Sequence, residues 1–540
     1  MPSSVGGPTP HPSPFLQGPF GPVENEVDAE DLEIAFGAIP ADLVGAYVRN
    51  GPNPAFPSRG GHHWFEGDGM LHRVHFKEEG KGAGFRNRFV RTASYLYQLS
   101  YGKKHNKRYF HSAFMDLRGF RSLVSLLLWR VADLLRQKLR LMWLIPMNPW
   151  GQRDLANTNI VPHGNNVYAL VESGLPTKVK MPSLETVGVE NFGGKLQHPF
   201  TAHPKICPIT GEMIFFCYQA DMPHCVLSSL SPDGVKGPSV DVGLDQGVMM
   251  HDFAITKNFA VIIDLPAVFD KKNVFKNNTI YQYDPERPGR IGLVRRSAIS
   301  DRSVQLGTSS FDDHNPSRLR KVPVEWFLVG KSCYSFHVLN AFEEEDGSGV
   351  VLDLIIYSGQ IDLDLARFLA NVHQHNTPGG RLTRWTMRYG AVRVEESIFL
   401  PSHDFEFPVI NNKFCGLKHR FGYFATGSFP TKKHELDLQF RGVTKYDFST
   451  NITLEWHTED GETNDEFVFV AKKQQQQQTS PIDEDDGYLV GYTVRPDFAS
   501  SHLVILDAKS MKLLCRLKLP QRVPHGFHGN WCPPSSFATN

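Results

Sequence analysis

Histidine is the residue type with the clearest chemical potential in this sequence, and four of its 23 copies stand in similar local contexts. Each lies beside strand-like sequence: His203 in TAHPK, His251 in MMHDFAIT, His337 in YSFHVLNAF and His528 in RVPHGFHGNW. The four are far apart in the chain, unlike the local ligand pairs of a zinc finger, so only a fold that joins distant strands could make them one site. Imidazole binds zinc, iron, copper or nickel, which leaves the identity of a bound metal open.

The stretch RVPHGFHGNW holds a second histidine, His525, three residues before His528. A histidine in a turn rich in glycine and proline is a common structural feature as well as a possible ligand. The spacing alone therefore does not decide which of the two could bind a metal.

Three glutamates stand out by their sequence context: two lie in apolar stretches, where a solvated charge is unexpected, and the third lies in a turn. Glu172 ends the strand-like stretch VYALVES, Glu406 lies in FEFPVIN, and Glu484 opens EDDGYLVGY within an acidic turn. A metal-bound histidine usually donates its other ring N–H to a carboxylate or a carbonyl. For Glu172 and Glu406 we therefore favour a buried carboxylate that seeks such a partner, whereas the acidic turn around Glu484 leaves its role open.

The elements that must position these side chains are short strands separated by turns. Each is rich in β-branched or aromatic residues and is bounded by Gly, Pro, Asn or Asp. Examples are VYALVES (167–173), EMIFFCYQA (212–220), FAVIIDL (259–265), VVLDLIIYS (350–358), YLVGYTV (488–494) and LVILDA (503–508). No alternating helical pattern indicates parallel βαβ units, so the sequence predicts an all-β, antiparallel architecture. A β-propeller is the closed form that fits best, although no repeat is visible.

Composition excludes several classes of function. The 57 basic and 57 acidic residues give a formal net charge of +0, which argues against nucleic acid as the main partner. Seven cysteines without a C-x-x-C pair are typical of reduced thiols in an intracellular protein. Nothing indicates an obligate protein partner. We expect residues 27–540 to form a single domain.

The N-terminal residues 1–26 are rich in proline, glycine and serine, and the sequence predicts that they are disordered. Before Arg49 there is no lysine or arginine, whereas acidic residues come early. A secretory signal needs a basic start and an apolar run, and transit peptides are rich in arginine and poor in acidic residues. Neither pattern is present, so we expect a cytoplasmic protein.

Two segments interrupt the strand pattern. Residues 119–150 are apolar and rich in leucine, with arginine and lysine spaced through them, so they do not resemble a membrane-spanning helix. A basic amphipathic helix at a membrane surface and an ordinary helix packed on the sheets both fit this composition. Residues 472–483 include five consecutive glutamines and are predicted to be a low-complexity surface loop.

The motifs around the candidate residues resemble those of the carotenoid cleavage oxygenases. The resemblance rests on TAHPK, MMHDFAIT, FHVLNAFEEEDG, EDDGYL and RVPHGFHG, together with RNGPNPAF (49–56), HHWFEGDGMLHRVHF (62–76), RFVRTASY (88–95) and ANTNIV (156–161). Nine segments in the order of the family, from about residue 27 to residue 531, make the resemblance specific.

The resemblance implies a seven-bladed β-propeller with one non-haem Fe(II) per chain on its axis. It implies that His203, His251, His337 and His528 bind the iron, and that Glu172, Glu406 and Glu484 support them. His525 falls where many members have a tyrosine, so it is not expected to be a ligand. The implied reaction is cleavage of a conjugated C=C bond of carotenoids or apocarotenoids by O2, which gives two carbonyl products.

Within the family, the plant-type enzymes that cleave at the 9,10 and 9′,10′ double bonds are the most similar. Their resemblance includes MMHDFAITKNFAVIIDLPAVF (249–269) and DLRGFRSLVSLLLWR (116–130). In family members the second region lies near the tunnel entrance. It implies a helical apolar cap that contacts a membrane through Leu126, Leu127, Leu128 and Trp129, and hence a peripherally membrane-associated protein.

Three alternatives remain at this stage. Stilbene-cleaving members carry a lysine directly before the first supporting glutamate, and here that position is Val171, which cannot bind a phenol in the same way. Isomerohydrolases of the visual cycle share the four histidines. A propeller that serves only as a binding scaffold is the alternative of another class, but such a scaffold has no reason to keep all four histidines and three glutamates.

Overall fold

A computed structural model describes residues 14–56, 62, 64–105, 154–172, 174–270, 281–300, 319–358, 379–427, 440–473 and 483–537. The predicted membrane-contacting segment 119–150, with Leu126, Leu127, Leu128 and Trp129, lies outside these residues, and so does the predicted helical cap. Most of the predicted low-complexity loop, residues 474–482, also lies outside them.

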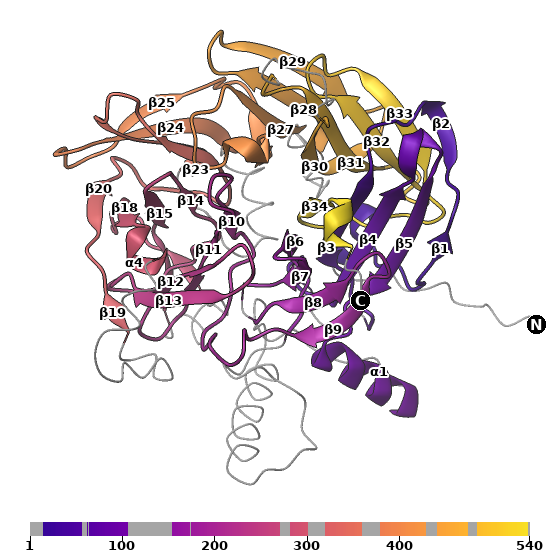
Figure 1. The fold of residues 1–540 in the computed structure, drawn as a ribbon, viewed down its shortest axis with the longest axis horizontal. Coiled ribbons are helices and arrows are strands. Elements are labelled where there is room, and N and C mark those ends of the chain that lie inside the picture. The colour runs from indigo at the N-terminus through magenta and orange to yellow at the C-terminus, as the bar shows by residue number, and fades with distance from the viewer. Residues whose placement is uncertain are drawn as a thin grey trace, which may run out of the picture.

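The described chain folds into mainly antiparallel sheets that follow one another around a common centre (Figure 1). This confirms the predicted all-β, antiparallel class. Two α-helices are described, α1 (Ala93–His105) and the short α4 (Ser297–Ser300). Five single-turn 3₁₀ helices are also described: η1 (Pro14–Leu16), η2 (Gly18–Phe20), η3 (Glu78–Gly80), η6 (Asn412–Phe414) and η7 (Pro534–Ser536).

The first half of the chain forms three sheets. The first has the order β1 (Asp28–Ala29), β5 (Ala83–Phe89), β4 (Gly69–Phe76), β3 (Gly45–Pro52), β34 (Gly529–Cys532). The second has the order β6 (Asn159–His163), β7 (Asn166–Leu170), β8 (Thr177–Lys180), β9 (Glu185–Val189). The third has the order β10 (Lys205–Ile206), β11 (Met213–Tyr218), β12 (Cys225–Leu230), β13 (Lys236–Asp241), β19 (Arg320–Lys321), and only its last pair is parallel.

The second half forms a fourth sheet of β14 (Ala254–Ile255), β15 (Phe259–Asp264), β18 (Arg290–Arg295) and β20 (Glu325–Leu328). A short ribbon of β16 (Ala267–Phe269) and β17 (Tyr281–Tyr283) follows β15. The next sheet contains β21 (Cys333–Tyr334), β22 (Val338–Glu343), β23 (Gly349–Ser358), β24 (Arg381–Arg388) and β25 (Glu395–Ile398).

The largest sheet has nine strands and consists of two parts. The first part is β26 (Asp404–Val409), β27 (Phe421–Gly427), β28 (Phe440–Asp447) and β29 (Ile452–His457). The second is β30 (Thr463–Ala471), β31 (Gly487–Val494), β32 (Ser501–Asp507), β33 (Leu513–Lys518) and the N-terminal β2 (Glu33–Gly37). A single residue pair, Phe440 with Asn464, joins the two parts.

The two ends of the chain exchange strands, and this closes the ring. The C-terminal strand β34 pairs with β3 in the first sheet, where Arg49 lies opposite Gly529. The N-terminal strand β2 pairs with β33 in the last sheet. Each terminus is therefore held by backbone hydrogen bonds from the other end of the chain.

Burial follows from the packing of one sheet against the next. Strands such as β3, β12 and β31 are buried at every position, because both of their faces are covered. The outermost strands β2, β25 and β29 are mostly exposed. The apolar core is divided accordingly into several clusters, and the largest packs the fourth and fifth sheets together.

Residues 14–26 differ from the disorder that their composition predicts. The side chains of Phe15 and Phe20 are only 3% and 8% exposed, and both pack against Trp64. The carbonyl of Pro19 accepts a hydrogen bond of 2.9 Å from the backbone N–H of His525. Two aromatic anchors therefore order a segment whose proline and glycine content alone suggested a random coil.

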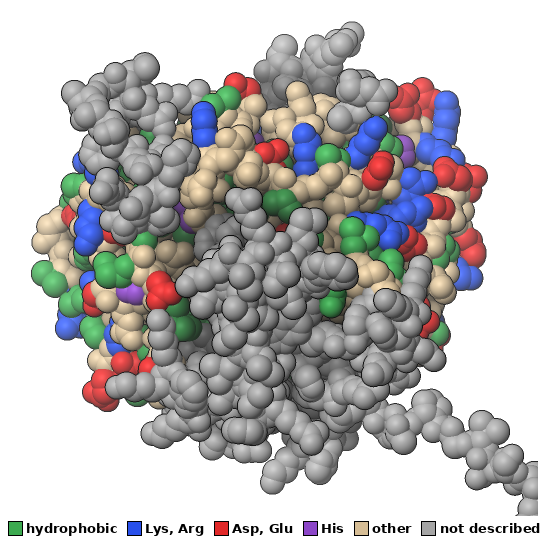
Figure 2. Space-filling model, turned by 90° about the horizontal axis from the view of Figure 1, so that it is seen from below, with side chains coloured by type: hydrophobic (Ala, Val, Ile, Leu, Met, Phe, Trp, Pro, Cys, Tyr) green, Lys and Arg blue, Asp and Glu red, His purple; other side chains and the backbone are tan. Residues whose placement is uncertain are grey.

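The surface of the described residues carries both signs of charge. On the face shown in Figure 2, Lys and Arg side chains lie interspersed with Asp and Glu. This fits the balanced composition of the chain. Within the described ranges, no helix is long and apolar enough to cross a membrane.

The buried position of Phe20 makes a prediction about stability. We expect Phe20→Ala to lower the free energy of unfolding by about 3 kcal/mol, because it removes a large apolar side chain from a packed cluster. The matched control is Phe36→Ala in β2, where the side chain is 53% exposed and the cost is expected to stay below about 0.5 kcal/mol. The shift of the guanidinium unfolding transition measures both, and equal shifts would contradict the packing of residues 14–21.

Candidate metal centre

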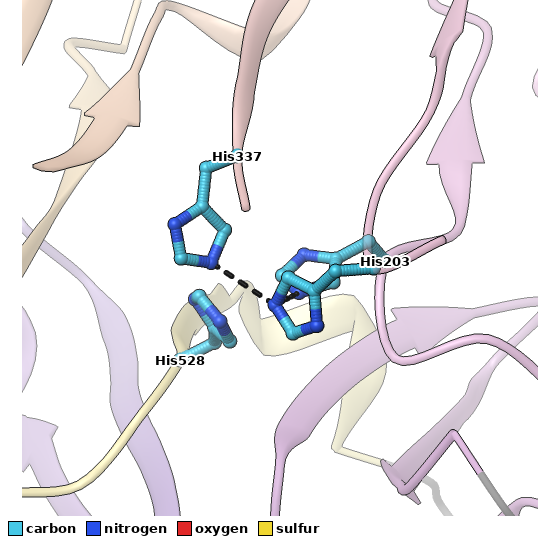
Figure 3. Close-up of side chains that lie close together, drawn as sticks. His203, His337 and His528 are labelled. Atoms are coloured by element: carbon cyan, nitrogen blue, oxygen red, sulfur yellow. Dashed lines mark hydrogen bonds between the residues drawn. The ribbon is translucent and has the colours of Figure 1, made fainter. Parts of the chain in front are cut away.

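The four histidines selected from the sequence converge on one point. Their ligand atoms all lie within 4.8 Å of one another, and all four side chains are buried. The Nε2 atom of His251 is 2.9 Å from that of His203 and 3.2 Å from that of His337. Figure 3 shows His203, His337 and His528 turned toward one another from different parts of the ribbon. The predicted histidine cluster is therefore present.

Each of the four histidines lies shortly before a strand, and Figure 1 shows three of these strands, β10, β14 and β34, on the inner side of the ring. The strands that follow them are β10, β14, β22 and β34. Because the sheets radiate from a common centre, the residues that enter these inner strands meet on the axis. The wide separation of the histidines in sequence follows from this geometry.

Asp252 connects three of these entry points. Its carboxylate is 2.7 Å from the Nζ atom of Lys205, two residues after His203. It also accepts a hydrogen bond of 2.9 Å from the backbone N–H of Val338, directly after His337. A side chain next to His251 thus fixes the segments that carry two other histidines.

The segment that carries His528 is held by its backbone and by a buried charge network. The backbone N–H of His528 donates to the carbonyl of Thr158 at 3.1 Å, and its carbonyl accepts from the N–H of Asn50 at 3.0 Å. The neighbouring Arg49 donates to Asp465 and to the carbonyl of Pro524. The turn before His528 is therefore tied to the first, second and last sheets.

His525 belongs to this network and not to the histidine cluster. Its Nδ1 atom pairs with Asp465, and its Nε2 atom lies 2.9 Å from the hydroxyl of Thr463. Both ring nitrogens are thus engaged in structural contacts. This agrees with the expectation that His528 rather than His525 faces the other histidines.

Three carboxylates contact the Nδ1 atoms of three of the histidines. Glu172 pairs with His251, and Glu406 pairs with His337. The third pair is His528 with Glu466, at 3.0 Å. A carboxylate at Nδ1 keeps the proton on that nitrogen, so that Nε2 is free to bind a metal. No carboxylate of the described residues pairs with His203.

Glu484 does not take the place that the sequence analysis gave it, so that prediction was wrong. Its carboxylate accepts hydrogen bonds of 2.9 Å and 2.8 Å from the backbone N–H groups of Arg420 and Phe421. It contacts none of the four histidines. The acidic turn that contains Glu484 serves to hold the backbone before β27.

Glu466 is the carboxylate that the sequence analysis missed. It lies in β30, a strand whose first eight positions are all buried, and charged side chains rarely occupy such positions without a partner. The stretch TNDEFVFVA therefore contains a usable signal: an acidic pair that begins a buried apolar strand. Asp465 of that pair holds Arg49 and His525, while Glu466 holds His528.

Hydroxyl and backbone donors hold the far oxygens of the three carboxylates. Tyr218 donates to Glu172, Tyr357 donates to Glu406 at 2.7 Å, and the backbone N–H of Gly529 donates to Glu466 at 2.8 Å. Burial, together with the adjacent carboxylate, raises the pKa of both tyrosines. They therefore stay protonated, and each carboxylate is fixed on both sides.

A bulge in β26 places Glu406 and the ring of Phe407 at the centre. The register of β26 shifts between Glu406 and Val409, and Phe407 has a φ of +48°, a value uncommon for a residue with a side chain. The ring of Phe407 lies 5.4 Å from that of His337 and 5.6 Å from that of His528. The bulge thus brings a carboxylate and an apolar wall to the same site.

Burial and mutual repulsion act on the protonation of the histidines. Burial and the three neighbouring imidazoles hold the pKa of His203 well below its ordinary value, and burial also lowers the pKa of His528. At His337, burial acts in the same direction, but Glu406 outweighs it and raises the pKa. The carboxylate that favours a proton on His337 equally favours a metal cation there.

The donor set fits one divalent transition metal. Four imidazole nitrogens that converge in a buried space suit iron, zinc, copper or nickel and do not suit calcium or magnesium, which prefer oxygen ligands. The carboxylates behind three of the imidazoles offset the metal's charge and fix ring orientation. His203, His251, His337 and His528 are therefore the residues that could hold the ion.

Two residues that are close in sequence to the predicted site residues do not belong to this cluster. His198 is buried, and its Nε2 atom is 3.3 Å from the hydroxyl of Ser228. Val171, directly before Glu172, is buried and apolar. It offers no hydrogen bond at the position where stilbene-cleaving members carry a lysine.

The finding that Glu466, and not Glu484, holds His528 can be tested directly. Glu466→Gln is expected to lower the affinity for Fe(II) about 10- to 100-fold, because an amide neither balances the metal's charge nor holds His528 equally well. Glu484→Gln is the matched control, with the same change of atoms away from the histidines, and its Fe(II) affinity should equal that of the wild type. Competition with a chromophoric chelator measures both affinities. A larger loss in the Glu484 variant would reverse the assignment.

Comparisons with known proteins agree with this site. A family model described as retinal pigment epithelial membrane protein matches residues 20–533. The carotenoid 9,10(9′,10′)-cleavage dioxygenase 1 of Pisum sativum is 31% identical over 537 residues, which cover 96% of this chain and 89% of the relative. The carotenoid cleavage oxygenase of Mycobacterium tuberculosis is 31% identical over 561 residues, which cover 96% of this chain and 98% of the relative.

Solved structures resemble this fold over nearly its whole length. The lignostilbene dioxygenase of Pseudomonas brassicacearum has a TM-score of 0.75 at 25% identity, with 96% of this chain and 98% of that one covered. A cobalt-substituted apocarotenoid oxygenase of Synechocystis has a TM-score of 0.71 at 25% identity, with 95% and 97% covered. Because the family model spans most of the chain and full-length relatives exceed 30% identity, the protein belongs to the carotenoid cleavage oxygenase family.

Proposed function

We propose that this protein is a non-haem Fe(II) dioxygenase that cleaves a conjugated C=C bond of carotenoids or apocarotenoids with O2. The observation that carries the proposal is the buried cluster of four histidines, three of which have a carboxylate at Nδ1. One Fe(II) per chain would be held by His203, His251, His337 and His528. A binding scaffold has no use for such a cluster, which costs the burial of several ionisable groups.

The residues around the centre favour this chemistry. Bound Fe(II) would supply the activation of O2, whose two oxygen atoms become the two carbonyl oxygens when the C=C bond breaks. The four histidines are neutral ligands, so the glutamates at Nδ1 balance the ion's charge from outside the coordination shell. The rings of Phe336 and Phe407 lie 5.8 Å from His251 and 5.4 Å from His337 and present apolar walls to the substrate. Such walls suit a hydrocarbon polyene and exclude water.

We propose the 9,10 and 9′,10′ double bonds as the cleavage position. The support is the similarity to the Pisum sativum dioxygenase, whose name states this position, and to the related enzymes of Arabidopsis thaliana and Crocus sativus at 30% and 32% identity.

Stilbene cleavage is the second candidate. The resemblance to the Pseudomonas brassicacearum lignostilbene dioxygenase favours it. The apolar Val171 opposes it, because the phenolic hydroxyl of a stilbene would lack the lysine found in stilbene-cleaving members. Isomerohydrolase activity has no particular feature of this chain in its favour.

Our proposal includes a seven-bladed propeller. Division of the nine-stranded sheet at the single pair Phe440–Asn464 gives two blades of four and five strands, and the five other large sheets complete the ring. We also propose that residues 119–150 form an apolar helical cap over the substrate entrance. The cap would contact a membrane from the cytoplasmic side, since carotenoids are stored in bilayers.

Cleavage with ¹⁸O₂ tests the activity. Fe(II)-loaded enzyme incubated with a detergent-solubilised C40 carotenoid should give a C13 ketone with a C14 dialdehyde or the matching apocarotenal, and both new carbonyls should carry ¹⁸O. His337→Ala should remove a metal ligand, lower iron content and abolish turnover while the fold remains. Mass spectrometry of the products and iron analysis measure these outcomes. Aldehydes from resveratrol and none from carotenoids would instead establish the stilbene function, and full activity of His337→Ala would overturn the four-histidine site.

The membrane proposal is tested with liposomes. Replacement of Leu126, Leu127 and Leu128 by Ser should weaken co-sedimentation with anionic vesicles several-fold, because three apolar side chains no longer enter the bilayer. Iron content should not change. Ile452→Ser with Leu454→Ser, two exposed apolar residues of β29, is the control for a general loss of surface apolarity. Unchanged co-sedimentation of the triple variant would refute the proposal.

A further inference from the structure

Trp64 is a buried residue whose polar atom has no role in the site described above. Its side chain is 8% exposed and lies in a cluster of aromatic rings. The ring centroids of its neighbours lie at these distances from that of Trp64: Phe527 at 5.0 Å, Phe20 at 5.1 Å, Phe15 at 6.4 Å and Phe65 at 6.4 Å. The indole is therefore surrounded by phenylalanine, which offers no hydrogen-bond acceptor of ordinary strength.

The indole N–H of Trp64 is buried and has no hydrogen-bond partner among the described residues. An indole can only donate, and a buried donor without an acceptor costs about 1–3 kcal/mol. Buried tryptophans usually place this group against an oxygen, as Trp385 does with Glu396 at 2.9 Å. An orphan donor of this kind calls for an explanation, and the oxygen of a bound ligand is an acceptor that would satisfy it.

The position of Trp64 connects it to the candidate metal centre. Phe527, the nearest of its ring neighbours, directly precedes His528. The carbonyl of Phe65 accepts a hydrogen bond of 3.0 Å from the side chain of Asn157. The next residue, Thr158, accepts a hydrogen bond at its carbonyl from the backbone N–H of His528. Trp64 therefore packs against the segment that leads into His528.

Water is a poor candidate for the missing acceptor. A buried water molecule needs two to four polar partners, and the rings around Trp64 supply none. The ligand that fits is mostly apolar and carries a single oxygen. Oxygenated carotenoids and apocarotenoids have this chemistry, because a hydroxyl, keto or aldehyde oxygen stands at the end of a hydrocarbon polyene.

We propose that the indole N–H of Trp64 donates a hydrogen bond to the oxygen of the substrate's end group and so selects oxygenated over purely hydrocarbon carotenoids. The inference rests on the proposed function and adds a residue that determines specificity. The aromatic rings of Phe15, Phe20 and Phe527 hold the indole in place, which gives the ordered N-terminal segment a function.

Paired substrates test this inference. The wild-type holoenzyme is assayed with a C40 hydrocarbon carotenoid and with its dihydroxylated derivative of the same polyene length. Trp64→Phe keeps an aromatic ring but removes the donor, so the ratio of kcat/KM for the hydroxylated over the hydrocarbon substrate should fall about tenfold. Trp64→His, which keeps a ring N–H, should restore part of the ratio. Trp326→Phe, in a distant sheet, is the matched control and should leave the ratio unchanged.

A spectroscopic readout on the wild type does not depend on turnover or on the folding of a variant. One of the eight tryptophan indole ¹⁵N–H resonances should shift downfield when the hydroxylated ligand binds and should not shift with the hydrocarbon. An unchanged selectivity ratio in Trp64→Phe, or eight unshifted resonances at saturating ligand, would overturn the inference. Absence of carotenoid cleavage by the wild type would refute the proposed function instead, so the two failures are distinguishable.

Discussion

The pairing of β34 with β3 is the interaction on which the rest of the site depends. Three of the four histidines enter successive sheets in chain order, but His528 comes from the last residues of the described chain and reaches the centre only because β34 joins the first sheet. The reciprocal exchange, in which β2 joins the last sheet, locks the same closure from the other end. Without this closure the ring would open beside its fourth ligand, and no local contact around His528 could restore the geometry. Arg49 connects both sides of the closure, because it lies in β3 opposite Gly529 and also forms the buried ion pair with Asp465 of β30.

Closure of the ring buries three carboxylates near its axis, and each of them has hydrogen-bonding partners there. Glu172, Glu406 and Glu466 each contact an imidazole on one side and a hydroxyl or backbone N–H on the other. A carboxylate buried this deeply would otherwise carry a large desolvation penalty. Because a bound cation would relieve that penalty, a metal ion and the three glutamates would stabilise one another. The centre is therefore part of the stability of the ring as well as a possible place of reaction.

Much of this arrangement could be predicted from the sequence, and the misses have physical reasons. The four histidines were recognisable because each stands in a distinctive motif, and the antiparallel class followed from the strand pattern. Glu484 was predicted because it opens an acidic turn in one of the motifs that carry the family resemblance, and Glu466 was not among the candidates. Only the contact between Glu466 and His528, 62 residues apart in the chain, shows which carboxylate holds that histidine. The order of residues 14–26 could not be read from composition, since it depends on a contact between Phe20 and Trp64 that no local pattern reveals. Long-range contacts of this kind determine which side chains meet in the site, whereas local sequence patterns determine the fold class.

The aromatic cluster around Trp64 includes none of the candidate metal ligands, and this division of residues suggests how one kind of centre could serve different substrates. A polyene offers no hydrogen bonds along its length, so nothing in the chain of double bonds itself tells the enzyme which bond lies over the metal. Shape alone must stop the substrate at the right depth, unless a polar end group meets a donor at a fixed place. A single donor in otherwise apolar surroundings acts strongly in that situation, because the alternative is a buried donor without a partner. If the proposed donor acts in this way, the metal ligands would determine that a double bond is cleaved, and a contact with the end group would determine which one.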